Sequence, residues 1–392
     1  MKPEKILMAH NYYQNLGGEE ESFRAEMSML KSRGHEVIVY TRSNEEIQAQ
    51  GVQNKLRLFS NTIWAHNSYA AIRQLIREHR PRIAHFQNIF PLISPSAYYA
   101  CHAEGIPVIQ ALRNYRLMCP NGFFFRSGRI CEDCMGKSFA WPGILHACYR
   151  NSRLQTAAVA GMLTYHRMVK TWESHVDLYI ALTEFSRTKF IQSGLSPEKI
   201  VVKPNYIPDP GAGNSPGDYA VYVGRLSPEK GIDVLMDAWK DLPAIHLKIV
   251  GTGPLTNKVQ KQIQDHKLNA ELMGYLPNEK ATDVIKKSAF LVFPSLWYET
   301  FGRTILEAFA CGKPVLASRH GTSVELIQEG VTGLFFDPGN AADLAKNVSE
   351  LWDSMGTTSQ MGKNARALYE EKYTLDKNYE QLMEIYRRLS VT

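Results

Sequence analysis

Two glutamates, Glu299 and Glu307, lie eight positions apart on either side of an expected helix start, with Gly302 between them. A glycine at this position lets a ligand approach the backbone, and the free N–H groups and dipole of the helix start attract a phosphate. Glu299 precedes the helix and can reach the group that is attached to the phosphate. Glu307 lies just over one turn inside, where a carboxylate can accept from a diol. The pattern therefore predicts a site for a phosphorylated polyol.

The residues around this pair resemble the conserved pattern of the retaining nucleotide-sugar glycosyltransferases called family 4, or group 1. Glu299, seven intervening residues and Glu307 are followed by Ala308, Cys311-Gly312 and Pro314-Val315. Other segments that resemble the family follow in its order: Gly17-Gly18, 223–231 (VGRLSPEKG), 249–254 (IVGTGP) and 330–334 (GVTGL). The resemblance covers nearly the whole chain and is more specific in its second half.

The sequence itself alternates strand and helix twice, which predicts an α/β protein with two doubly wound parallel sheets. The expected strands are 5–9, 35–40, 83–86, 107–112 and 178–183, then 220–223, 247–250, 289–293 and 314–317. A Pro/Gly-rich linker, 204–218, separates the two runs. The resemblance implies the GT-B fold, in which two Rossmann-like domains face each other across a cleft.

The domain boundaries follow from that alternation and from the resemblance. We expect an acceptor-side domain at 1–205, with a Cys-rich insertion at about 115–150, and a nucleotide-sugar-binding domain at 206–377. The resemblance implies that the last segment, 378–392, is a helix that crosses back to the first domain.

Positive charge is expected beside the two glutamates. Arg225 and Lys230 flank the turn after strand 220–223. Arg225 can bind phosphate oxygens through the N–H groups of its guanidinium, and Lys230 supplies a point charge. A solvated surface pair is the alternative. With the resemblance, Arg225, Lys230 and Glu299 become the expected catalytic residues. The residues expected to bind the donor are Gly17, Gly18, Gly224, Gly251, Gly253, Tyr275, Leu276, Phe301, Gly302, Arg303, Thr304 and Glu307.

Some of these residues have simpler explanations. Gly251 and Gly253 alone usually mark only a tight turn, and Gly17-Gly18 can serve helix capping before three acidic residues. His10 and His85 end expected strands, and each can be a structural histidine. Many relatives carry a histidine in the cleft where this chain has Arg113, which can bind an acid or a phosphate but cannot act as a base near neutral pH.

Four cysteines lie within one stretch of 30 residues: Cys119, Cys131, Cys134 and Cys148. In a cytoplasmic protein such clustering favours a metal over disulfides, and four thiolates suit structural zinc. Cys119 stands alone, so the spacing resembles a zinc ribbon only loosely. Reduced thiols without metal, an iron–sulfur cluster and disulfides remain alternatives.

Charge and hydropathy limit the partners. Residues 51–172 carry 15 basic and four acidic residues, which indicates either a solvated surface or a face for an anionic acceptor such as a lipid pyrophosphate, or for the acidic membrane that carries it. No apolar run approaches the roughly 18 residues of a spanning helix, and the chain starts directly with a strand, so we expect a cytoplasmic protein that can touch the membrane peripherally.

The expected reaction is transfer of a sugar from a UDP- or GDP-sugar to a glycan or lipid-linked acceptor, with retention, in cell-surface polysaccharide synthesis. No Asp-x-Asp occurs in the sequence, and we expect catalysis to require no metal or other cofactor. Retention by same-face attack is favoured over double displacement on Glu299, because no second carboxylate is identifiable as its partner. A phosphorylase or epimerase on the same fold is the alternative enzyme. A nucleic-acid-binding protein is disfavoured, because it leaves the second-half pattern unexplained, and no nucleic acid is expected as a partner.

Overall fold

The computed structural model describes residues 4–14, 17–47, 52–213 and 217–389 of the chain. The chain forms two compact units. Unit 1 comprises Met1–Phe124, Glu132–Tyr206 and Asn378–Thr392, and unit 2 comprises Phe125–Cys131 and Ile207–Lys377. Part of the expected linker, 214–216, lies outside the described residues.

Unit 1 is built on a six-stranded sheet in the order β2-β1-β3-β4-β7-β8, and all of its strand pairs are parallel. Its strands are β1 (Lys5–Tyr12), β2 (Glu36–Ser43), β3 (Ile83–Asn88), β4 (Val108–Ala111), β7 (Leu178–Ala181) and β8 (Ile200–Val202). Strands β3, β4 and β7 are buried along their whole length, as expected when helices cover both faces of a parallel sheet.

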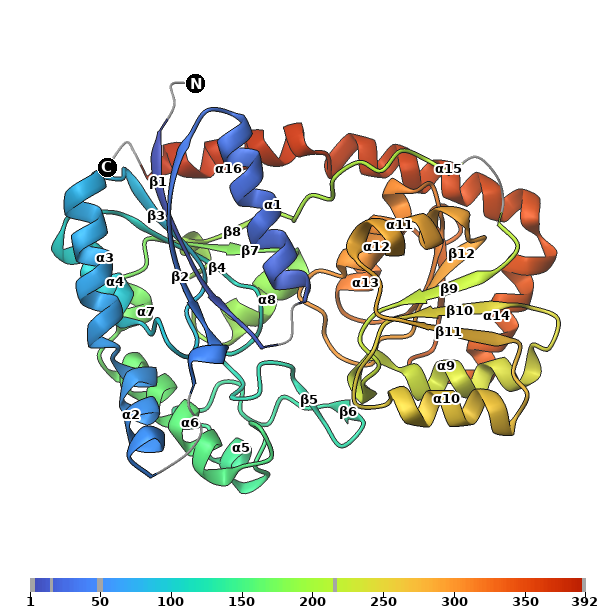
Figure 1. Cartoon of the computed structure of the whole chain (residues 1–392), viewed down its shortest axis with the longest axis horizontal. Helices are drawn as coiled ribbons and strands as arrows, with labels where there is room; N and C mark the ends of the chain where they lie inside the picture. Colours follow the sequence, from blue (N-terminus) through green and yellow to red (C-terminus); the bar gives the residue numbers. More distant parts are fainter. Residues whose placement is uncertain (1–3, 15–16, 48–51, 214–216, 390–392) are drawn as a thin grey trace. The chain divides into compact units, whose positions relative to one another are not determined.

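The helices of unit 1 are distributed along the sequence between its strands (Figure 1). They are α1 (Gly18–Ser32), α2 (Val52–Ile63), α3 (His66–His79), α4 (Ser96–Ala103), α5 (Trp141–Leu145), α6 (Arg153–Met168), α7 (Thr171–Ser174) and α8 (Glu184–Gln192). The final helix, α16 (Leu375–Arg388), contributes the residues from Asn378 onward. Tyr386 on α16 contacts His85 of β3 through a 2.9 Å hydrogen bond between its hydroxyl and Nδ1.

Unit 2 has a second six-stranded parallel sheet, in the order β11-β10-β9-β12-β13-β14. Its strands are β9 (Ala220–Val223), β10 (Leu247–Val250), β11 (Ala270–Gly274), β12 (Phe290–Phe293), β13 (Val315–Ser318) and β14 (Gly333–Phe336). Its helices are α9 (Ile232–Ala238), α10 (Thr256–Asp265), α11 (Asn278–Lys287), α12 (Arg303–Ala310), α13 (Thr322–Leu326), α14 (Ala341–Asp353) and α15 (Met355–Lys372).

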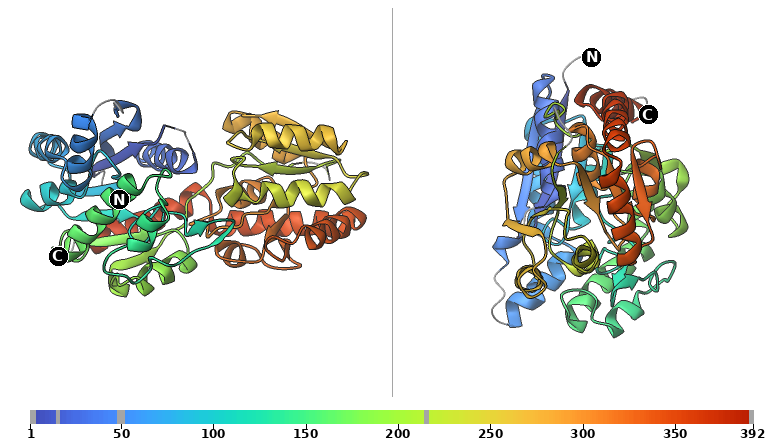
Figure 2. Two further views of the ribbon diagram at one scale, coloured as in Figure 1. Left: turned by 90° about the horizontal axis from the view of Figure 1, so that it is seen from below. Right: turned by 90° about the vertical axis from the view of Figure 1, so that its right-hand side faces the viewer.

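Helices lie on both faces of this second sheet (Figure 2). Helix α9 packs against α10 and α14, while α12 packs against α11 and α15. Trp239, just after α9, is fully enclosed in the apolar core, where its indole N–H donates to the carbonyl of Ile245 at 3.0 Å. The fold prediction, two doubly wound α/β domains, is therefore confirmed.

Each sheet has one point where the strand order reverses. In unit 2 that point lies between β9 and β12, and in unit 1 between β1 and β3. Ligands of open α/β sheets bind beyond the carboxyl ends of the strands at such a point. No helix in the described part of the chain has the length and apolar character to cross a lipid bilayer.

Candidate functional site

The loops that follow β9 and β12 meet at the switch point of unit 2. Lys230, in the loop after β9, donates from Nζ to Oε1 of Glu299, in the loop after β12, at 2.5 Å. Ser295 Oγ and Trp297 Nε1 donate to the same oxygen at 2.8 and 2.9 Å. The Glu299 side chain is 12% exposed and that of Lys230 is 26% exposed, so the carboxylate is fixed while both groups remain accessible to a ligand.

A second charged pair lies beside the first. Arg225 Nη2 lies 2.5 Å from Oε1 of Glu229, and Ser227 Oγ donates to the same oxygen at 2.6 Å. Burial acts to raise the pKa of Glu229, but the hydrogen bonds from Ser227 and Arg225 hold it below its ordinary value. The guanidinium of Arg225 is 47% exposed, so Glu229 orients it without enclosing it.

Glycine is required where these loops approach each other. A Cβ on Gly231, at a φ of +70°, would lie 1.8 Å from the carbonyl oxygen of Pro294. A Cβ on Gly251, at a φ of +136°, would lie 1.9 Å from the carbonyl oxygen of Gly224. Neither position tolerates a side chain. Gly251 and Gly224 thus let the loops after β10 and β9 pack at backbone distance, and Gly253 packs in the same way on Leu226.

Helix α12 begins beside the first charged pair. Gly302 is its N-cap, with a φ of +83° in the left-handed region that favours glycine. Within the first turns, Arg303 Nε donates to Oε1 of Glu307 at 2.8 Å. The side chain of Glu307 is 9% exposed and that of Arg303 is 14% exposed. Arg303 Nη1 is buried with no hydrogen-bond partner among the described residues, so this guanidinium has donor capacity left for a ligand.

Sequence reasoning did not find the residues that hold the Glu299 loop from the other side. His320 Nε2 lies 2.6 Å from the carbonyl oxygen of Ser295, and Thr322 Oγ1 donates to the carbonyl of Glu299 at 2.6 Å. Burial lowers the pKa of His320, so the neutral ring donates from Nε2. Both residues follow β13, the next strand in the sheet. A position directly after the strand that neighbours β12 was the sequence signal that could have identified His320 and Thr322. Glu229, Ser295 and Trp297 were not predicted as site residues either.

The other expected donor residues lie around the same edge. Phe301 is buried and Thr304 is half-buried at the start of α12. Tyr275 is 68% exposed directly after β11, with Leu276 half-buried beside it. The structure thus gathers the unit 2 residues expected from the sequence at the carboxyl edge of one sheet, and Tyr275 has a free aromatic face there.

In unit 1, Gly17 and Gly18 form the start of α1. Gly17 is the N-cap in extended backbone, and its N–H donates to Oε2 of Glu20 at 2.8 Å. The capping interpretation therefore holds locally. Next to it, Asn114 Nδ2 donates to Oε1 of Glu19 at 3.1 Å, and Glu19 Oε2 is buried with no hydrogen-bond partner among the described residues. Burial raises the pKa of Glu19 to about 7.

Arg113 does not present its charge as an exposed phosphate-binding group. Its side chain is 3% exposed, and Nη2 lies 3.2 Å from Oε2 of the equally buried Glu26. Nε donates to Gln87 Oε1 at 2.8 Å, and Nη1 donates to Asn205 Oδ1. Arg113 therefore stabilises the interior of unit 1. His10 and His85 are buried as well, and burial lowers the pKa of His10 to about 3 and that of His85 to about 4, so both rings are neutral near pH 7.

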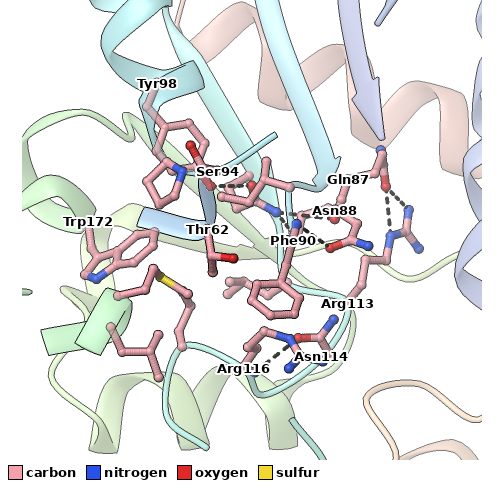
Figure 3. Close-up of a pocket in the computed structure, with 18 residues that line it drawn as sticks. Thr62, Gln87, Asn88, Phe90, Ser94, Tyr98, Arg113, Asn114, Arg116 and Trp172 are labelled. Carbon is pink, nitrogen blue, oxygen red and sulfur yellow. Dashed lines mark hydrogen bonds between the residues drawn. The ribbon is translucent and has the colours of Figure 1, made fainter. Parts of the chain in front are cut away.

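A small pocket opens at the carboxyl ends of β3 and β4 in unit 1 (Figure 3). Its free volume is about 60 Å³. Apolar side chains, including Phe90 and Trp172, line much of it, while Asn88, Asn114 and Arg116 line its polar side. Arg116 is held in place, because its guanidinium carbon lies 4.3 Å from the centre of the Phe90 ring and Nη1 donates to the carbonyl of Pro120 at 2.9 Å.

The expected zinc site is not supported. Among the described residues, no group of three or more His, Cys, Asp or Glu side chains is placed to hold a metal ion. Cys134 instead packs in an apolar cluster with Ala140 and Ala160. Cys119 is buried at the end of the turn that begins at Tyr115, where its N–H donates to the Tyr115 carbonyl at 2.9 Å. Packing and backbone hydrogen bonds therefore order this segment.

Two family models match the chain in succession. The model of the glycosyl transferase 4-like domain matches residues 17–206, and the model of the glycosyl transferases group 1 matches residues 209–368. Both descriptions agree with the family that the sequence resembles.

Two of the similar relatives match over shorter lengths. The O-antigen chain mannosyltransferase C of Escherichia coli is 30% identical over 175 residues, which is 44% of this chain and 47% of that protein. D-rhamnosyltransferase WbpZ of Pseudomonas aeruginosa is 33% identical over 161 residues, 40% of this chain and 42% of that protein. The chain thus spans about half the length of these relatives, or less.

Solved structures match over the whole chain. HepE of Anabaena, in complex with UDP and glucose, superposes with a TM-score of 0.70 at 20% identity, covering 99% of this chain and 100% of that one. Sucrose-phosphate synthase of Thermosynechococcus elongatus gives a TM-score of 0.73 at 17% identity, covering 99% of each chain. These likenesses establish the GT-B fold.

Proposed function

Because the chain belongs to the group 1 glycosyltransferases, we propose that it transfers a sugar, with retention, from a UDP- or GDP-sugar to a glycan or lipid-linked acceptor. The observation that carries the proposal is the ion pair between Lys230 and Glu299 at the switch point of unit 2. Next to this pair, the N-terminus of α12 offers backbone N–H groups, and Glu307 offers a carboxylate one turn further.

The positive groups match the charge that the reaction creates. Breaking the bond between the anomeric carbon and the phosphate leaves a nucleoside diphosphate anion. Arg225, Lys230 and the start of α12 lie on adjacent loops, where fixed positive charge stabilises that anion most in the transition state. We propose that these groups perform this role without a metal ion, in keeping with the lack of an Asp-x-Asp segment in the sequence.

Glu299 is better suited to hold the donor sugar than to attack it. Its Oε1 accepts from Lys230, Ser295 and Trp297, so that oxygen is immobilised and its charge is compensated. A nucleophilic carboxylate would have to give up part of this compensation to form a bond. We therefore assign Glu299 to the sugar hydroxyls, and retention to attack on the same face, with the leaving phosphate accepting the acceptor's proton.

The relatives support a role in polysaccharide synthesis. One is named for the O-antigen chain and another for D-rhamnose transfer. HepE, which shares the fold, was solved with UDP and with UDP-glucose. We propose the same class of donor here, bound with its ribose diol on Glu307 and its diphosphate at the start of α12.

Proton NMR of donor hydrolysis tests this proposal. The full chain is incubated with UDP-, GDP- and ADP-sugars in EDTA, with the Lys230→Ala variant in parallel. We expect one donor to be hydrolysed, with the first-formed sugar in the anomeric configuration of the donor and little turnover by the variant. An inverted first product would contradict retention, and activity that EDTA abolishes and magnesium restores would contradict the metal-free mechanism. Failure to hydrolyse or bind any of these donors would overturn the function itself.

A further inference from the structure

Helix α6 is apolar on two opposite faces. One face is buried in unit 1 and carries Val159 and Leu163, which are 1% and 2% exposed. The other carries Leu154 and Met168, which are 71% and 77% exposed, with Tyr165 between them. The intervals of 11 and 14 residues from Leu154 bring all three side chains onto one stripe of a 3.6-residue helix. A surface helix ordinarily has one apolar face toward the core and a polar face toward solvent, so this second, exposed apolar stripe indicates a further partner.

Neighbouring elements also carry exposed apolar side chains. Helices α5 and α2 both pack against α6, and the three helices lie together in unit 1 (Figure 1). Exposed large apolar side chains gather on and beside them, and we call this set the α5–α6 patch: Phe59, Phe139, Trp141, Leu145, Leu154, Tyr165, Met168 and Val169. Single exposed apolar residues are ordinary, but several of them on and beside helices that pack together indicate an interaction surface.

The segment that carries most of the patch is basic, and the exposed Asp133 and Glu173 lie directly beyond its two ends. Residues 134–172 contain five basic residues and no Asp or Glu. Lys137, Arg150, Arg153 and Lys170 are exposed. The fifth, Arg167, is used within the unit, where Nη1 donates to the carbonyls of Lys137 and Ser138 at 2.5 and 3.2 Å. The partner of the patch must therefore combine an apolar layer with negative charge.

An anionic lipid surface has that combination. Trp, Tyr and Leu side chains enter the boundary between headgroups and acyl chains, while Lys and Arg around them pair with anionic headgroups. Lys137 and Trp141 show this arrangement, with Nζ lying 5.9 Å from the centre of the indole ring. A second copy of the chain fits less well, because a symmetric contact through this patch would bring basic residues against basic residues.

We propose that the α5–α6 patch docks unit 1 peripherally on an anionic membrane. Leu154, Met168 and Trp141 enter the interface, while Arg153, Lys170 and Lys137 bind the headgroups. The docking does not depend on the donor chemistry of unit 2, and it would keep unit 1 at the surface where a lipid-linked acceptor is held.

Vesicle co-sedimentation of the full chain tests this proposal. Vesicles of phosphatidylcholine alone are compared with vesicles that also contain phosphatidylglycerol. We expect binding only to the anionic vesicles, and weaker binding at high salt. Leu154→Glu with Met168→Glu should reduce the partition coefficient at least about tenfold, since it replaces two inserting apolar groups by charges of the lipid's sign. Val331→Glu, at a 42% exposed position of unit 2, is the matched control and should bind as the wild type does.

A second pair of variants tests the electrostatic contribution to vesicle binding. Each Lys or Arg near an anionic surface contributes about a fivefold factor, so Arg153→Gln with Lys170→Gln should reduce binding about 30-fold. Lys280→Gln with Lys346→Gln makes the same charge change on exposed residues of unit 2 and should have little effect. Circular dichroism and nucleoside diphosphate binding should be unchanged in all variants, which separates this proposal from the donor site.

Two results would overturn the proposal. One is the absence of binding to anionic vesicles, or equal binding by the wild type and the patch variants. The other is a dimer in light scattering that Leu154→Glu with Met168→Glu dissociates, which would assign the patch to a second copy of the chain.

Discussion

Lys230 Nζ and Glu299 Oε1 lie 2.5 Å apart, although 69 residues separate them in the chain. Their loops follow β9 and β12, which are neighbours only because the strand order of unit 2 reverses between them. The pair therefore marks the position where open α/β sheets bind their ligands. In the proposed site, the two groups have different roles: the Lys230 ammonium stabilises the leaving phosphate, and the Glu299 carboxylate binds the sugar hydroxyls.

Removing this cation should reduce turnover strongly. Lys230→Ala should cost about 2 to 4 kcal/mol of transition-state stabilisation, the scale for losing one preorganised charged donor. The ratio kcat/KM with the preferred donor measures the loss, and Lys280→Ala, at an exposed position on α11, serves as the control. A loss of less than about threefold would show that Lys230 does not face the developing charge.

Replacing Glu307 should weaken nucleotide binding more than it slows turnover. Glu307→Gln keeps the size of the side chain but weakens its acceptance from Arg303 and from a ribose diol, so we expect nucleoside diphosphate affinity to fall about tenfold, consistent with loss of a charged hydrogen bond. Calorimetry measures this affinity. Thermal unfolding without nucleotide measures how much Glu307 contributes to stability, because its Oε1 accepts a hydrogen bond from Arg303 Nε at 2.8 Å. Unchanged affinity in the variant would refute the ribose assignment.

The close packing of Gly231 on Pro294 gives a prediction about stability. Gly231→Ala combines a left-handed backbone with a Cβ 1.8 Å from a carbonyl oxygen, whereas Gly330→Ala, at a φ of +73°, meets nothing within 4 Å. The control should lose only the roughly 1 to 2 kcal/mol of left-handed strain. Gly231→Ala should lose clearly more, and also donor affinity, in urea unfolding and calorimetry. Equal losses would show that the loops after β9 and β12 are not packed as described.

Acid should destabilise unit 1 through His10. Burial, with the charges of Arg113 and Arg24, lowers the pKa of His10 from 6.5 to about 3. The unfolded chain binds this proton as pH falls below about 6.5 and the folded chain does not, so stability is full above that pH and falls with pH below it. At pH 5 this linkage amounts to about 2 kcal/mol.

His10→Phe should remove that part of the acid sensitivity. The ring lies stacked on Phe23 at 4.7 Å, and neither nitrogen has a hydrogen-bond partner among the described residues, so phenylalanine is a suitable replacement. Urea midpoints at pH 7 and pH 5 measure the change, with the exposed His266→Phe as the control. An unchanged pH dependence in the variant would mean that His10 is not buried as a neutral ring.

The sequence predicted the central strands well and missed strands at the sheet edges. Expected strands 220–223 and 247–250 coincide with β9 and β10, because these runs are strongly apolar and bounded by turns. Strands β8, β11 and β14 were not predicted. Each lies at one edge of its sheet. Strand β11 is half-exposed along most of its length, so its apolar pattern is weak, whereas β8 and β14 are apolar but only three and four residues long.

The candidate site divides in a similar way. Glu299, Glu307, Lys230 and Arg225 were predicted from their positions around two turns together with the resemblance to the group 1 family, because the spacing of two glutamates alone is weak evidence. The supporting contacts from His320 and Thr322 arise from the packing of a third loop, and no local spacing records them. The zinc prediction was not supported, since four cysteines close in sequence need a particular backbone path to converge on one ion. Arg113, for which the sequence left open an acid or a phosphate as partner, forms a buried pair with Glu26, 87 residues away in the chain.

Hydrogen–deuterium exchange with and without nucleoside diphosphate tests the central claim most directly. The N–H groups at the start of a helix lack intrahelical acceptors, so a bound phosphate should protect them strongly. We predict that UDP or GDP slows exchange in 224–231 and 299–307 of unit 2, with no change in α6, and that Lys230→Ala diminishes this protection. Protection confined to other segments, or none at saturating nucleotide, would contradict a donor site at the junction of β9 and β12.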